Sequence, residues 1–158
     1  MFTGTLITVL LILHGLAGVA LVGLTTHQAI AVWKTRPLAA KNFVQAYVNT
    51  RASTYTNATV LIYIATFIGG GLIYPTYVMD VKSSLTDASM NPPIGLFEIK
   101  EHVAVYGLAM LPSYWWLWKK AAPSEHVFAR QMNTTLIALI VWWSFIIGYI
   151  LNNIKGLL

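Results

Sequence analysis

Four long stretches of the chain consist almost entirely of apolar residues. No Asp, Glu, Lys or Arg occurs in residues 1–33, 52–79 or 131–154, and 95–118 carries such charges only in its first turns. A helix needs about 20 consecutive apolar residues to cross the hydrocarbon of a bilayer. The pattern therefore predicts an all-α integral membrane protein, a four-helix bundle formed by one transmembrane domain, 1–158. The predicted spans cover about 5–32, 56–79, 95–118 and 128–152.

The connections between these spans differ in pattern. In residues 37–53, apolar side chains recur at helical spacing on one face and polar side chains occupy the other. This predicts a short amphipathic helix in the membrane interface, with an ordered polar loop as the alternative. Residues 81–93 are rich in Ser, Asp, Asn and Pro, which predicts a loop.

The basic residues predict the orientation. Seven of the ten lie in or beside the connections between the first and second and between the third and fourth predicted spans, while four of the five acids lie toward the other side. Lys and Arg accumulate on the cytoplasmic side of membrane proteins. We therefore expect a multi-pass protein of the cytoplasmic (inner) membrane, with both termini on its non-cytoplasmic side. The seven are Lys34, Arg36, Lys41, Arg51, Lys119, Lys120 and Arg130.

Composition excludes several classes of protein. Hydrophobic residues make up 57% of the chain and charged residues 9%, against about 25% charged in an average soluble domain. The net charge of +5 forms short clusters beside apolar spans rather than a stripe, which argues against nucleic-acid binding. The absence of cysteine excludes disulfides, thiolate metal sites, iron–sulfur clusters and thioether-linked haem. The N-terminus lacks a basic region before a long apolar run, so we expect Met1 onward to remain in the mature protein.

Two histidines share a depth in the outer half of the predicted bundle. His14 is about nine residues into the first span and His102 about seven into the third, which places both roughly 11–14 Å along parallel helices. Ionisable residues inside a membrane are rare and usually functional. A pair at one level is what bis-histidine ligation of a haem requires, so His14 and His102 are the predicted ligands of a first haem iron.

The other two histidines, His27 and His126, share the inner level near the headgroups, where histidine costs little. They are candidate ligands of a second haem. His27 lies about 20 Å from His14 along the helix axis. However, it projects about 140° away around the helix, so two haems would need two different clefts or a curved first helix.

A charged run opens the third span. Glu98 and Glu101 are candidate proton acceptors for a quinol oxidised at the outer side, because a carboxylate at the membrane boundary can act as a general base. Alternatively, Glu98, Glu101 and His102 join His14 in a copper, zinc or iron site. A solvated entry turn is the plain structural interpretation. At the ends of the second span, Tyr77 is a candidate hydrogen-bond donor to a quinone or a haem propionate, and Arg51 to an inner haem.

Together, His14, His27, His102, His126 and the mid-span glycines Gly15, Gly18, Gly23, Gly69, Gly70 and Gly71 give the chain a resemblance to small four-helix membrane b-type cytochrome subunits of electron-transfer complexes. The resemblance is one of architecture and lacks a family-specific motif. It implies haem b (one group, or two), electron exchange with quinone, and partner subunits in a larger complex. The alternatives are a non-redox accessory subunit of a respiratory or photosynthetic complex and a membrane metal-binding protein.

Overall fold

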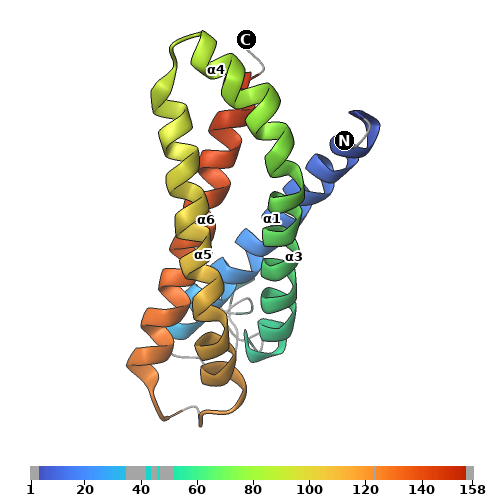
Figure 1. The fold of residues 1–158 in the computed structure, drawn as a ribbon. Coiled ribbons are helices and arrows are strands. Elements are labelled where there is room, and N and C mark those ends of the chain that lie inside the picture. The colour runs from blue at the N-terminus through green and yellow to red at the C-terminus, as the bar shows by residue number, and fades with distance from the viewer. Residues whose placement is uncertain (1–3, 35–41, 44–45, 47–51, 123, 156–158) are drawn as a thin grey trace.

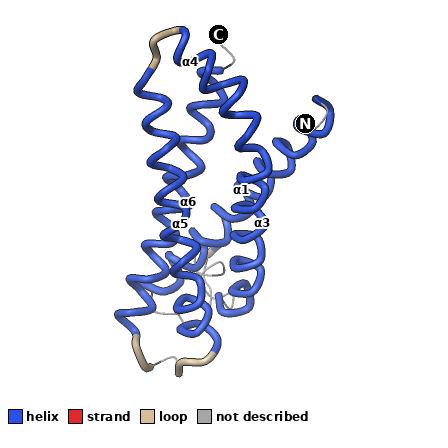
Figure 2. The backbone as a smooth tube through the Cα atoms, in the orientation of Figure 1, coloured by secondary structure: helices blue, strands red, loops and turns tan. Residues whose placement is uncertain are grey.

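The computed structural model describes residues 4–34, 42–43, 46, 52–122 and 124–155, and the regular elements in that part of the chain are helical (Figures 1 and 2). The interfacial helix predicted for about 37–53 falls largely outside the described residues, and so does Arg51. The elements are α1 (Gly4–Trp33), η1 (Ala52–Tyr55), α3 (Thr56–Thr76), η2 (Tyr77–Lys82), α4 (Ser83–Asp87), α5 (Asn91–Lys119) and α6 (Val127–Lys155).

Within the described residues, three helical stretches are long and apolar enough to cross a membrane: Gly4–Trp33, Ala52–Asp87 and Val127–Ile154. They confirm the membrane class of the protein. Helix α5, with 29 residues against 30 in α1, is not one of the three. Its first turns carry charged residues and its second half is rich in Tyr and Trp, whose polar groups lower its hydropathy. The fourth span therefore stays a prediction.

The loop predicted for 81–93 is wrong, because the chain remains helical through Asp87 and resumes a helix at Asn91. Three side-chain hydroxyls in this stretch donate hydrogen bonds to the carbonyl four residues earlier, which satisfies their polar groups inside a helix: Ser83, Ser84 and Thr86. The prolines Pro92 and Pro93 lie in the first turn of α5, where a missing N–H costs nothing.

The four long helices contact one another in a ring. Helix α1 packs against α3 and α6, and α5 packs against the same two helices. Six buried side chains from all four helices form the main core: Leu21, Tyr63, Leu111, Tyr114, Ile137 and Val141. Beyond this core, toward the N-terminus, α1 leans away from α5 and α6 (Figure 1). At the end that holds both chain termini, η2, α4, α5 and α6 pack instead around a second core of Leu85, Ile147 and Leu151.

Candidate functional site

A cavity of about 460 Å³ lies between the four long helices, on the N-terminal side of the main core along α1. This volume is within the range of small-molecule and cofactor sites. Its wall is mostly apolar, with glycines from α1, α3 and α6 and a few polar side chains. The polar members of the lining are His14, Tyr63, Thr66, Lys100, Glu101, Ser144, Tyr149 and Asn152.

His14 is the histidine of this wall. Its imidazole lies against two glycines of α3: a Cβ added at Gly69 would be 3.3 Å from Nδ1, and one at Gly70 would be 3.4 Å from Cε1. Glycine at both positions thus gives the ring its place between α1 and α3. The Nδ1 atom is buried and lies toward α3, beside Gly69 and the backbone of Thr66. The imidazole as a whole lines the cavity, which makes this part of the wall a candidate ligand site.

Two further polar features line the cavity from α5 and α6. Lys100 and Glu101 form an ion pair of 2.8 Å, and the Lys100 ammonium also lies 4.3 Å from the centroid of the Phe97 ring. On α6, the hydroxyl of Ser144 is buried without a hydrogen-bond partner. The cavity therefore combines a mostly apolar wall with an imidazole, an ion pair and a hydroxyl that has no hydrogen-bond partner.

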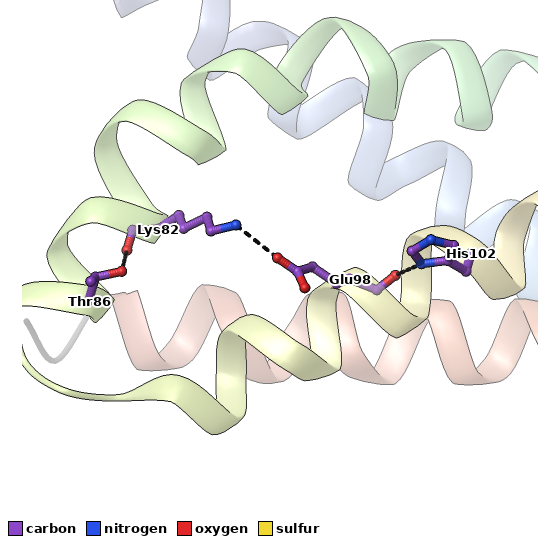
Figure 3. A network of polar contacts seen from close by, with 4 residues as sticks. All are labelled: Lys82, Thr86, Glu98 and His102. Atoms are coloured by element: carbon purple, nitrogen blue, oxygen red, sulfur yellow. Dashed lines mark hydrogen bonds and ion pairs between the residues drawn. The ribbon is translucent and has the colours of Figure 1, made fainter.

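His102 and Glu98 lie outside the described lining of this cavity. His102 is exposed, and its Nδ1 is 2.7 Å from the carbonyl oxygen of Glu98 (Figure 3). The carboxylate of Glu98 pairs with Lys82 at 2.8 Å, across the gap from η2 to α5 (Figure 3). The structure thus brings His14 and Glu101 to one cavity and leaves His102 and Glu98 on an exposed face of α5.

The two inner histidines pack against different aromatic rings. His27 is buried on α1, edge-on to Tyr55 of η1 with 5.4 Å between ring centroids. His126 is exposed just before α6, has a positive φ of 51°, and lies 5.4 Å from the ring of Trp116. Their role as ligands of a second haem stays a prediction.

Tyr77 belongs to an aromatic cluster rather than to the cavity wall. It is buried and stacks on Phe97 with 3.7 Å between ring centroids, and its hydroxyl has no hydrogen-bond partner. The described residues hold no group of three or more His, Asp or Glu side chains close enough to bind a metal ion. The copper, zinc or iron site considered from the sequence is therefore not assembled there.

A buried polar network near the inner end was not predicted. The amide of Gln28 donates to the carbonyl of Ala52 at 3.0 Å and to the hydroxyl of Thr56 at 3.3 Å. Its oxygen accepts hydrogen bonds from Thr59, at 3.1 Å, and from Tyr114. The only sequence signal for this network is an amide side chain within an otherwise apolar span.

No protein-family model, curated protein or solved structure matches this chain. Any inference about the function of this chain therefore rests on its own residues and their geometry.

Proposed function

We propose that this chain is an electron-transfer subunit of a membrane complex that holds haem b in the cavity beside His14. The observation that carries the proposal is the half-buried imidazole of His14 in the wall of a mostly apolar cavity, where it is the histidine of the described lining. Histidine is the usual protein ligand of haem b. Glycines at 15, 18, 70 and 148 line the same cavity and leave its wall without side chains at those positions, which suits a flat macrocycle.

Three residues of the cavity lining would have separate roles in this site. His14 would bind the iron through its imidazole, and bound haem supplies one-electron chemistry. Lys100 is the cation of the lining and would pair with a propionate. Glu101 would accept a proton from a quinol. The sequence predicted His102 as a second ligand and a second haem at His27 and His126, and these three histidines lie outside the described cavity lining.

The exposure of the cavity rim supports exchange with a lipophilic partner such as quinone. Ile12 and Tyr149 line the cavity, yet they are 57% and 65% exposed. In a bilayer these side chains would face lipid between α1 and α6, so a ligand dissolved in the membrane could enter from the side. Four spans, both termini outside the cytoplasm, and residence in the inner membrane complete the proposal.

A reduced-minus-oxidised spectrum of the protein, purified natively in mild detergent, tests the haem. We expect an α-band and a Soret band that are lost in His14→Ala and retained in His126→Ala, the matched control on an exposed histidine. The absence of a Soret band from native preparations would contradict the proposal. Large subunits that co-purify without any chromophore would favour an accessory role instead.

A further inference from the structure

We infer that a haem in this cavity has His14 as its only histidine ligand and keeps its opposite coordination position open to a small diatomic ligand beside Ser144. The inference rests on the proposed function and goes beyond it, because an open position makes the site a receptor for a ligand as well as an electron carrier. Bis-histidine ligation would leave no such position.

The placement of the histidines is the first argument. All four lie in the described part of the chain, and only His14 lines the cavity. His102 is exposed on α5 with its Nδ1 at the Glu98 carbonyl. His27 packs on Tyr55 and His126 on Trp116, away from the described lining.

The remaining side chains of the wall are poor candidates for the sixth ligand. The Lys100 side chain is an ammonium that contacts Glu101 and the Phe97 ring, and an ammonium has no lone pair to give to an iron. The hydroxyl of Tyr63 donates to the carbonyl of Ala104 at 2.9 Å. No sulfur ligand is present either, because the chain has no cysteine and the described lining contains no methionine.

Ser144 is the hydrogen-bond donor that we place beside the open coordination position. His14 leans on the glycines of α3, whereas Ser144 comes from α6, with Val141 and Phe145 beside it in the lining. Its buried hydroxyl makes no hydrogen bond within the protein. A neutral diatomic molecule fits an apolar pocket of this kind, and the hydroxyl would donate a hydrogen bond to its outer atom.

Carbon monoxide added to the reduced, haem-loaded full-length protein tests the open position. We expect a high-spin spectrum that shifts to that of a carbon monoxide adduct, and we expect both spectra to be unchanged in His102→Ala. In His14→Ala the haem should be lost and should return with free imidazole in the buffer, which separates loss of a ligand from misfolding. A low-spin haem that does not bind carbon monoxide and is altered by His102→Ala would overturn the inference while leaving the proposed function standing. A protein without haem would instead refute the proposed function.

The hydroxyl is tested by infrared spectroscopy of the carbon monoxide adduct. Removing a hydrogen-bond donor raises the C–O stretching frequency, so we expect an upward shift in Ser144→Ala. Ser84→Ala is the matched control, since Ser84 is exposed, lies outside the described cavity lining and donates to the carbonyl of Asp80 in the preceding helical turn. An unchanged C–O stretching frequency in Ser144→Ala would show that Ser144 does not donate a hydrogen bond to the bound ligand.

Discussion

At the scale of single residues, a close approach of α3 and α5 depends on Gly107. Tyr63 of α3 reaches across α5 so that its hydroxyl donates to the carbonyl of Ala104 at 2.9 Å. A Cβ at position 107 would overlap the Tyr63 hydroxyl, and it would lie 2.8 Å from Cζ of the same ring and 3.0 Å from a methyl carbon of Ile140. Because Tyr63 lines the cavity and also belongs to the main core, this contact sets one wall of the candidate site.

Replacing Gly107 by alanine should therefore push α3 and α5 apart. We expect Gly107→Ala to destabilise the protein by about 1–3 kcal/mol, the usual cost of overpacking a filled core. Thermal unfolding followed by circular dichroism in mild detergent measures the change. Gly71→Ala on α3 is the control, because a Cβ there meets nothing within 4 Å. If both variants unfold at the wild-type temperature, the close approach of Tyr63 is not what holds these helices.

Residue types and depth in the span were enough to single out His14 as a site residue, because an imidazole in the middle of an apolar helix is unusual. They do not show which residues of the other helices lie beside it. Sequence places Glu98, Glu101 and His102 together, but the helix turns Glu101 into the cavity and His102 onto an exposed face. The contact of Gln28 with Tyr114 was equally hidden, since it joins side chains 86 residues apart on different helices.

At the scale of elements, one arginine holds the turn between α5 and α6. Arg130 is buried in the first turn of α6 and donates to the carbonyls of Leu117, at 2.8 Å, Ala122, at 2.9 Å, and Glu125, at 3.3 Å. The carbonyls at the end of a helix lack partners within it, and a cation near them is favourable. Arg130 thus ends α5 and fixes the turn that leads into α6.

We expect Arg130→Ala to cost about 1.5–3 kcal/mol, because buried carbonyls lose hydrogen bonds to a charged group. Arg130→Lys should recover only part of this stability, since an ammonium lacks the planar fork that reaches several carbonyls. Chemical unfolding in mixed micelles, together with limited proteolysis of the α5–α6 turn, measures both effects. Lys120→Ala, at an exposed position in the same turn, should behave like wild type. Full stability of Arg130→Lys would show that charge alone suffices.

Long uncharged apolar runs predicted α1 and α6 closely, because length and hydropathy can be read along one segment of the chain, whereas α5 begins four residues before the predicted residue 95. The limits of α1 differ from the prediction by one residue at each end, and α6 begins one residue earlier than predicted. Residues 81–87 were misassigned because Ser and Thr favour turns in water but can bond the preceding helical turn instead. Tertiary packing also stabilises the helix in that segment, because Leu85 is fully buried against Ile147 and Leu151 of α6.

At the scale of the whole molecule, the surface carries large apolar side chains that a water-soluble protein would bury. On α1 alone, Ile12 is 57% exposed and Leu16 is 62% exposed, and both belong to the N-terminal half of the helix. Helix packing cannot cover these positions in the structure, so lipid would. Hydropathy does not decide whether α5 also crosses the membrane, because its charged and aromatic residues lower its mean hydropathy.

Reporter fusions along the chain decide that question. If α5 crosses, fusions after Lys34 and Lys120 should both report the cytoplasm, while fusions after Asp87 and at the C-terminus should report the opposite side. If α5 does not cross, the reports after Lys120 and at the C-terminus should be exchanged. Four spans would keep the basic residues of both inner connections in the cytoplasm, as the charge rule requires. Three spans would instead place Lys119, Lys120 and Arg130 on the non-cytoplasmic side. The α5 residues of the cavity wall would then no longer lie at the same depth in the membrane as His14.

We therefore expect the four-span pattern. A cytoplasmic C-terminus would contradict both this topology and the assignment of the cavity to the membrane interior.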